Sequence, residues 1–268
     1  MTDPQITLIG AGRMGSALVG GWINAGGAGR ISIIDPSPSS VVEDWVRTDQ
    51  VKLNPKPTIA DILVIAVKPQ GFGALAEDMR SRIGPNTRIL SIMAGVNLAT
   101  LEAKLKTSSV TRAMPNTPGL IGKGVTILCP KPGASQATLN EMTTLLAPLG
   151  AVEGPITEDL LPAATALSGC GPAYGFLLVE AMAAAGAAQG LQSDLAMRLA
   201  RQTVEGAGAL LASVPEDAAT LRRNVTSPNG VTQAALEVLM SSSGMPSLFI
   251  DAVKAAIARD LELSRETE

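Results

Sequence analysis

Short apolar runs alternate with helical patterns through the first half of the chain. Five of these runs have the length of β-strands, namely Ile6–Ile9, Ile31–Ile34, Ile62–Val67, Arg88–Met93 and Val125–Leu128. Helical patterns lie between them at Met14–Ala25, Phe72–Arg82 and Asn97–Leu105. Runs such as "ILVIAV" are apolar at nearly every position, which is typical of parallel strands covered on both faces. This alternation predicts a doubly wound α/β sheet.

The pattern changes after about Pro155. One more helix–strand unit is expected at Ser135–Leu149, and beyond it the strand-like runs stop. Long Ala-rich helical stretches follow at Ala173–Gln189, Asp194–Ala212, Thr232–Met240 and Pro246–Glu266. The fold class predicted is α/β, with an N-terminal Rossmann-type doubly wound domain at residues 1–157 and an all-α dimerisation domain at residues 158–268. Several of these helices are too apolar to be solvated on all sides, so we expect a homo-oligomer.

Composition narrows the classes of function. The 268 residues are 46% apolar and carry a net charge of −3, which gives no basic field for nucleic acid. The first residues show no basic region followed by an apolar stretch, so we expect no signal peptide. The uncharged stretch from Leu160 to Val179 contains Pro162, Gly169 and Pro172, which favour a buried helix over a membrane span. A cytoplasmic protein with no membrane partner is expected.

The chain contains no histidine. This excludes His-ligated metals, Ser-His-Asp triads and dehydrogenases that use histidine as the acid or base. The two cysteines, Cys129 and Cys170, have neither a metal-ligand spacing nor a disulfide pattern. No metal site is expected, and any proton transfer must use other groups.

The stretch "ITLIGAGRMGSALVGGWI" predicts a dinucleotide site. Gly10, Gly12 and Gly15 have the G-x-G-x-x-G spacing, directly after a strand and at the start of a helix. A tight turn, room for a pyrophosphate and a helix N-terminus are then brought together. Arg13 and Met14 complete this predicted cofactor-binding loop.

The cofactor's identity is left open by the sequence. Asp35 lies about 20 residues beyond the glycines, where an acid usually binds the ribose hydroxyls of NAD and repels the 2′-phosphate of NADP. The following "PSPSS" supplies hydroxyls, beginning with Ser37, that could instead hold a phosphate with the help of Arg13. NADPH and NADH therefore both remain candidates.

Further cofactor contacts are expected where later strands end. Residues Ala66, Val67, Lys68 and Pro69 follow one strand, and Ala94 and Gly95 follow the next. The carboxyl edge of a doubly wound sheet is where the nicotinamide half of the cofactor lies. Asn116, in a loop stiffened by prolines, could hydrogen-bond a carboxamide.

Two features of the second half could bind a substrate. In "LSGCGPAY", Ser168 could cap a helix that Gly171 and Pro172 begin. In "NVTSPNGVTQAAL", an Asn-Gly turn precedes a new helix, so that backbone N–H groups and a helix N-terminus converge on one point. Such a loop is an anion site suited to a carboxylate, although a plain capped turn would look the same.

Taken together, these motifs resemble pyrroline-5-carboxylate reductase over nearly the whole chain. The resemblance is carried by "GAGRMG" at 10–15, "AVKPQ" at 66–70, "MPNTP" at 114–118, "SGCGPAY" at 168–174 and "VTSP" at 225–228. It departs from the family pattern at Asn229, where the family usually has glycine, and at Cys170, where it most often has serine.

The resemblance implies NAD(P)H-dependent reduction of the cyclic imine Δ1-pyrroline-5-carboxylate to L-proline, the last step of proline biosynthesis. It also implies a substrate site containing Ser168 and the loop residues Ser227, Asn229, Gly230, Val231 and Thr232. The backbone amides of this loop would hold the carboxylate, and the Thr232 hydroxyl, the catalytic group, would face the imine nitrogen. The resemblance also implies a homodimer, which in the family is often assembled into a higher oligomer.

Three alternatives remain beside this function. A reductase of another cyclic imino acid fits the same residues. A non-catalytic NAD(P)-sensing Rossmann protein is disfavoured by the presence of both a cofactor loop and an anion loop. A β-hydroxyacid dehydrogenase is disfavoured because no lysine occurs between Lys131 and Lys254, where that class needs its catalytic lysine.

Overall fold

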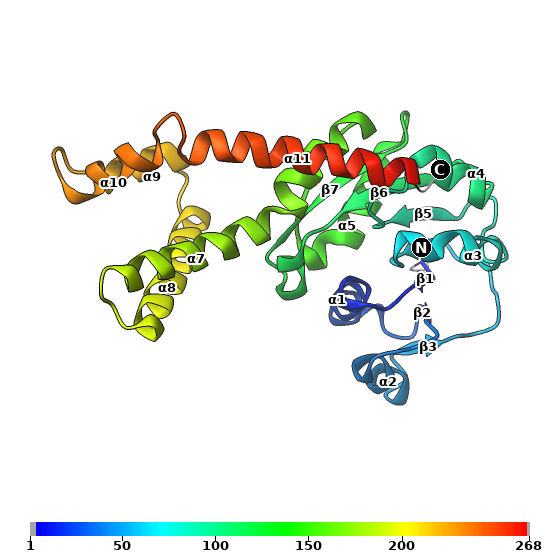
Figure 1. Cartoon of the computed structure of the whole chain (residues 1–268). Helices are drawn as coiled ribbons and strands as arrows, with labels where there is room; N and C mark the ends of the chain where they lie inside the picture. Colours follow the sequence, from blue (N-terminus) through cyan, green and yellow to red (C-terminus); the bar gives the residue numbers. More distant parts are fainter. Residues whose placement is uncertain (1–3, 267–268) are drawn as a thin grey trace. The chain divides into compact units, whose positions relative to one another are not determined.

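Eight strands form one sheet in the computed structural model, which describes residues 4–266 (Figure 1). Their order across the sheet is β3-β2-β1-β4-β5-β6-β7-β8. All neighbours are parallel except β6 and β7, which are antiparallel. The strands are β1 (Ile6–Ile9), β2 (Ile31–Ile34), β3 (Val51–Leu53), β4 (Ile62–Ile65), β5 (Arg88–Ser91), β6 (Val110–Met114), β7 (Gly124–Pro130) and β8 (Gly150–Glu153).

The strand order reverses between β1 and β4. The chain runs outward from β1 through β2 to β3, and then returns to place β4 on the other side of β1. At such a reversal, the loops after the two strands diverge to opposite faces and leave a crevice at their carboxyl ends. The glycine loop follows β1 and therefore lies at this crevice.

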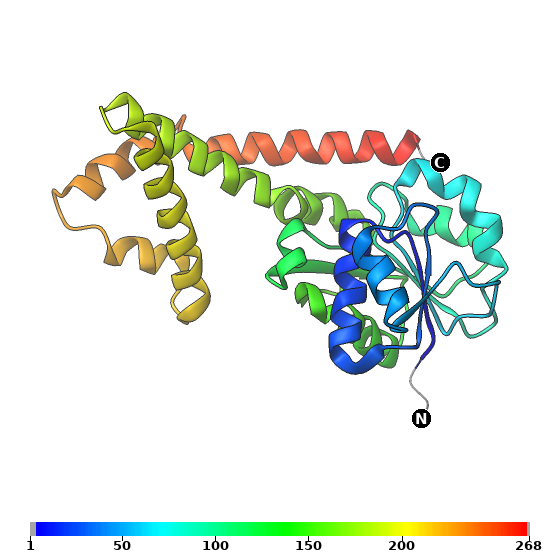
Figure 2. The same ribbon diagram turned by 90° about the horizontal axis from the view of Figure 1, so that it is seen from below.

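Helices cover both faces of the sheet (Figure 2). One core joins the sheet to α1, α2 and α5, and the other joins it to α3 and α4. Successive residues of β4 alternate between them, with Ile62 and Val64 in the first core and Leu63 and Ile65 in the second. The uniformly apolar strands are explained by this double covering. The helices are α1 (Arg13–Trp22), α2 (Ser40–Arg47), α3 (Pro69–Arg80), α4 (Leu98–Leu105) and α5 (Gln136–Leu146).

Trp22 connects α1 to α5 through a buried hydrogen bond. Its ring is buried, and its indole Nε1 donates a hydrogen bond of 2.7 Å to the Leu145 carbonyl oxygen. We expect Trp22→Phe to keep most of the apolar packing but to leave that carbonyl without its partner. Chemical denaturation should show a loss of about 1–3 kcal/mol in the free energy of unfolding. A change below about 0.5 kcal/mol would mean that water replaces the indole there.

The chain divides by its contacts into two units. The sheet unit comprises the residues up to Gly169 together with those from Ala256 onward, and the helical unit is Cys170–Ala255. The sheet unit also contains α6 (Leu161–Ala164). The helical unit is built from α7 (Gly171–Ala188), α8 (Ser193–Ser213), α9 (Ala218–Asn224), α10 (Val231–Leu239) and the first part of α11 (Met245–Glu266). This division differs from the sequence-based boundary at 157/158, because residues 158–169 and the end of α11 pack with the sheet.

The helical unit exposes many large apolar side chains. Phe176 and Leu177 of α7 and Val231 and Val238 of α10 are each more than 60% exposed. One helical stretch in the described part of the chain, Glu158–Ala188, is long and apolar enough to cross a membrane by length and composition alone. Exposed large apolar side chains that gather in one unit are typical of an interaction surface.

Candidate cofactor and substrate site

The three glycines of the first loop have different structural roles. Gly10 has a φ of +91°, and a Cβ there would lie 2.8 Å from Val67 Cγ1. A Cβ on Gly15 would collide with the Gly10 carbonyl oxygen. Gly12, by contrast, has a φ of −64°, and a Cβ there would meet no atom within 4 Å. Gly10 and Gly15 therefore shape the turn, whereas Gly12 leaves open space in front of α1.

That open space faces a helix N-terminus. Gly12 is the N-cap of α1, so no side-chain oxygen caps the first turn, which begins with Arg13 and Met14. The first amides of a helix lack intrahelical partners, and the helix dipole adds partial positive charge. The arrangement suits the pyrophosphate of a dinucleotide.

Asp35 links the glycine loop to the turn after β2. Its Oδ2 accepts a hydrogen bond of 2.7 Å from the Ala11 amide, and its Oδ1 accepts one of 2.8 Å from the Ser37 amide. Asn54 holds the backbone of Asp35, because its Oδ1 accepts from the Asp35 amide and its Nδ2 donates to the Asp35 carbonyl, both at 2.9 Å. Sequence reasoning missed Asn54, whose left-handed φ of 47° is visible only in the structure.

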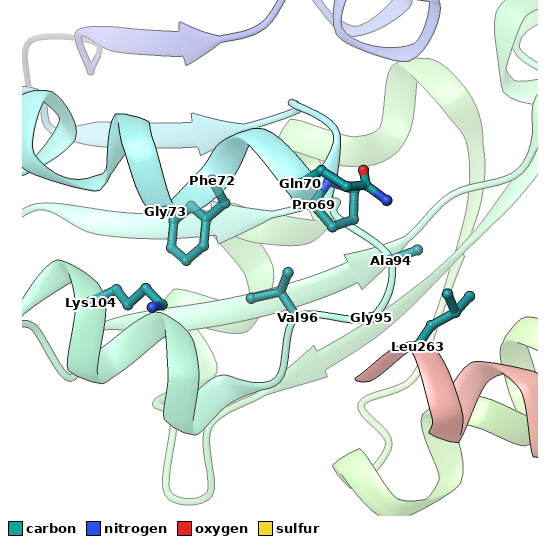
Figure 3. A pocket seen from close by; sticks show the side chains of 9 residues that line it. All are labelled: Pro69, Gln70, Phe72, Gly73, Ala94, Gly95, Val96, Lys104 and Leu263. Carbon is teal, nitrogen blue, oxygen red and sulfur yellow. The ribbon is translucent and has the colours of Figure 1, made fainter. Parts of the chain in front are cut away.

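The loops after β4 and β5 meet beside a cavity of about 490 Å³ (Figure 3). Three predicted cofactor residues line it: Pro69 at the start of α3, and Ala94 and Gly95 after β5. Leu263, near the end of α11, closes another side. Ala66, Val67 and Lys68 precede Pro69, and Lys68 is the N-cap of α3. The sheet unit thus brings the predicted cofactor residues after β4 and β5 to one edge.

Asn116 is occupied within the protein. Its Oδ1 accepts a hydrogen bond of 2.9 Å from the Val125 amide, and its Nδ2 donates one of 3.0 Å to the Ser168 carbonyl. The side chain therefore ties the loop after β6 to β7 and to the segment before α7. A cofactor contact by Asn116 remains a prediction, and it would use the second Nδ2 hydrogen or the second lone pair of Oδ1.

The sequence-based assignment of Ser168 as a helix cap is wrong. The π-helical segment Thr165–Gly169 continues past it, and its hydroxyl donates a hydrogen bond of 2.8 Å back to the Ala164 carbonyl. The N-cap of α7 is instead Cys170, without a side-chain capping bond. The prediction that Pro172 lies in the first turn of this helix is confirmed. A substrate contact by Ser168 remains a prediction.

The Cys129 thiol and the Tyr174 phenol are not activated. Burial raises the pKa of Cys129 to about 11, which keeps it a neutral thiol. Burial and the neighbouring Cys170 raise the pKa of Tyr174 above its usual value, so the phenol stays protonated at neutral pH. Tyr174 also packs edge-on against Phe249, with ring centroids 5.8 Å apart.

The loop before α10 uses two of its backbone amides within the protein, so fewer are free than the sequence predicted. Asn229 adopts a left-handed φ of 57°, and its amide donates to Gln233 Oε1 at 2.8 Å. The Gly230 amide donates to the Ser227 carbonyl at 3.0 Å. The amides at the start of α10, from Val231 onward, remain available, because their N-cap is Gly230 and has no side chain.

Thr232 is the second residue of α10 and is exposed. Its hydroxyl has no hydrogen-bond partner among residues 4–266. It lies one residue beyond Val231, so a hydroxyl and two free amides adjoin at one helix end. These substrate-loop residues belong to the helical unit, whereas the predicted cofactor residues belong to the sheet unit.

Comparisons with known proteins agree with both halves of this arrangement. The family described as pyrroline-5-carboxylate reductase dimerisation matches residues 158–263, and that described as NADP oxidoreductase, coenzyme F420-dependent, matches residues 5–95. The pyrroline-5-carboxylate reductase of Pseudomonas aeruginosa is 38% identical, over 99% of each chain. The structure of a pyrroline-5-carboxylate reductase from Coxiella burnetii is 32% identical, with a TM-score of 0.90 over 98% of this chain and 99% of that one.

A third relative carries a cofactor. The pyrroline carboxylate reductase of Plasmodium falciparum, solved with NADP bound, is 27% identical, with a TM-score of 0.80 over 98% of this chain and 99% of that chain. Identity above 30% over nearly the full length of both chains exceeds what a shared fold alone requires. The chain therefore belongs to the pyrroline-5-carboxylate reductase family.

Proposed function

We propose that the protein reduces Δ1-pyrroline-5-carboxylate to L-proline with NADH or NADPH, the final step of proline biosynthesis. The observation that carries this proposal is the start of α10, where a free hydroxyl on Thr232 adjoins unpaired amides. A small carboxylate can be held there without arginine, lysine or histidine. The backbone amides and the hydroxyl at this helix end are therefore sufficient to bind the substrate.

A dinucleotide would be held at the carboxyl edge of the sheet. Gly12 and the amides that open α1 would hold its pyrophosphate, and Asp35 would hold its adenosine ribose. Pro69, Ala94 and Gly95, which line the cavity after β4 and β5, would hold its nicotinamide half. When bound there, a reduced nicotinamide supplies the hydride. The protein's part is to fix its position and to exclude water.

The substrate can arrive already protonated, which explains why no histidine is needed. A carbonyl reductase must protonate a developing alkoxide and so requires a strong, positioned acid. A cyclic iminium has its proton in place and gains only a hydride at carbon. The Thr232 hydroxyl accepts a hydrogen bond from the ring nitrogen and orients it, while the Val231 and Thr232 amides hold the carboxylate.

A second copy of the chain is the expected cover for the apolar surface of the helical unit. The stretch 158–188 is interrupted by Pro162 and by the π-helical turn before α7, which suits protein packing better than lipid. The family matched by residues 158–263 is described by dimerisation. We therefore infer a soluble, cytoplasmic homodimer, which can assemble further, and whose partners are a small imine and its own copy. Its net charge of −3 does not favour nucleic acid.

The strained turn of the substrate loop should be sensitive to the residue at 229. Alanine at the observed φ of 57° costs about 1–2 kcal/mol relative to glycine, whereas asparagine tolerates it better. We expect Asn229→Ala to raise the KM for the imine by about threefold to tenfold through loss of the loop conformation. Asn229→Gly is the matched control and should keep the KM of the parent. Equal KM values for both variants would contradict the assigned loop.

Imine-dependent oxidation of the reduced nicotinamide tests the reaction itself. Purified protein is mixed with NADH or NADPH and the five-membered or the six-membered imino acid, and the reduced-nicotinamide absorbance is followed. We expect the highest kcat/KM with the five-membered ring. A higher kcat/KM with the six-membered ring would identify the protein as a reductase of another cyclic imino acid. If the protein binds the cofactor tightly but oxidises neither NADH nor NADPH, it would instead be a sensor of the nicotinamide dinucleotides.

A further inference from the structure

The carboxylate and the backbone of Asp35 are held by four hydrogen bonds. Each of its oxygens accepts a backbone amide, from Ala11 at 2.7 Å and from Ser37 at 2.8 Å. Asn54 holds the peptide groups on both sides of the same residue with two further bonds of 2.9 Å. Turning the carboxylate away would leave the Ala11 and Ser37 amides without these partners, which costs free energy. The side chain therefore stays at the junction of the glycine loop and the turn after β2.

This junction is where a dinucleotide places the 2′-position of its adenosine ribose. A carboxylate has about four acceptor sites, and Asp35 uses two of them on amides. The remaining lone pairs can accept from ribose hydroxyls, which are donors. A 2′-phosphate has no such hydrogens to offer and brings negative charge against a negative group that cannot withdraw.

The turn after β2 offers a 2′-phosphate serine hydroxyls but no cation of its own. No lysine or arginine occurs between Asp35 and Arg47, and Arg47 is paired with Asp44 at 2.8 Å. Glu43 and Asp44 add further negative charge to α2. The cations that could compensate are Arg13, which opens α1, and Lys56, which lies two residues beyond Asn54.

We infer that Asp35 makes this protein select NADH over NADPH, because its fixed carboxylate accepts from the ribose hydroxyls and repels a 2′-phosphate. The inference rests on the proposed position of the cofactor at the glycine loop. Asp35 is then the residue that discriminates between the two dinucleotides.

Calorimetric titration with two fragments isolates this discrimination from catalysis. ADP-ribose and 2′-phospho-ADP-ribose differ only in the phosphate, and neither can transfer a hydride. We expect ADP-ribose to bind the folded dimer at least about tenfold more tightly. Equal binding, or tighter binding of the phosphorylated fragment, would overturn the selectivity. Failure of both to bind would overturn the proposed cofactor site itself.

Variants then assign the effect to Asp35. Asp35→Asn keeps the shape and removes the charge, and should lower the affinity ratio to about one. Adding arginine in Asp35→Asn/Pro36→Arg should make the phosphorylated fragment the tighter ligand, because Pro36 is exposed and adjoins the ribose site. An unchanged ratio in Asp35→Asn would remove Asp35 from the discrimination.

Two controls separate this effect from general electrostatics. Glu153→Arg on β8, at the opposite edge of the sheet from β2, raises the net charge as much as the double variant but should leave the ratio unchanged. Arg13→Ala and Lys56→Ala should each leave the ratio unchanged or raise it only slightly. Suppose that the parent protein prefers the phosphorylated fragment and that Arg13→Ala or Lys56→Ala selectively abolishes its binding. The cation removed, and not Asp35, then determines which dinucleotide binds.

Discussion

Gly12→Val should raise the dissociation constants of both NADH and NADPH by more than about a hundredfold while leaving the fold unchanged. The reason is the open space in front of this residue. A Cβ at Gly12 would meet no protein atom within 4 Å, and its φ of −64° suits any residue. The valine methyl groups would instead occupy the volume through which the pyrophosphate reaches the first amides of α1. Quenching of protein fluorescence or calorimetry measures the affinity, and the thermal midpoint measures the fold.

The neighbouring glycines provide the contrast. Gly15→Ala would drive its Cβ into the Gly10 carbonyl, and Gly10→Ala would combine a φ of +91° with a contact of 2.9 Å to the Ala66 carbonyl. Both should lower the thermal midpoint as well as the cofactor affinity. If Gly12→Val is destabilised like these two, the space in front of α1 has a structural role. If it binds NADH as tightly as the parent, the pyrophosphate lies elsewhere.

The sequence predicted the sheet best where nearly every residue of a strand is apolar or β-branched. β1 and β2 were predicted with their observed bounds, because every residue in them except Ser32 is apolar or β-branched. β3, with only Val51–Leu53, was missed, since three residues at an edge carry no periodic signal. β6 was missed because Thr111 and Arg112 interrupt its apolar pattern, yet both are buried there.

The burial of Arg112 depends on partners far along the chain. Its Nη1 donates to Glu158 Oε1 at 2.7 Å, and the same oxygen accepts from the Leu98 amide at the start of α4. The carboxylate is 46 residues away in sequence from the arginine, so no local pattern reveals the pair. Predictions from periodicity count charged residues as exposed, and here the tertiary structure overrides that rule.

The candidate site divides in a similar way. Motif spacing located the glycine loop and the start of α10, because both are encoded by adjacent residues with special backbone needs. It could not find the clamp from Asn54 to Asp35, which joins the ends of two neighbouring strands 19 residues apart. Nor could it show that the Asn229 and Gly230 amides are already used within the loop. Those details decide which donors remain for a substrate.

Replacing Thr232 by valine should lower kcat for imine reduction by about tenfold to a hundredfold, with little change in cofactor affinity. Valine keeps the branched shape and the backbone amide, and it removes only a hydroxyl that has no partner within the described residues. The carboxylate should still be held by the amides of α10, so KM should change much less than kcat. Steady-state kinetics with saturating NADH or NADPH separates these two terms.

Thr232→Ser completes the test, because it restores the hydroxyl without the methyl group. We expect it to recover most of the parent kcat, whereas Thr232→Ala should behave like Thr232→Val. A higher KM for the imine with an unchanged kcat in the valine variant would show that Thr232 binds the substrate without orienting its nitrogen. If valine and threonine turn over equally fast, the hydroxyl has no role, and the α10 amides that hold the carboxylate are enough to position the substrate. The ratio of the valine and serine rates therefore measures what a single exposed hydroxyl contributes in a site that has no histidine.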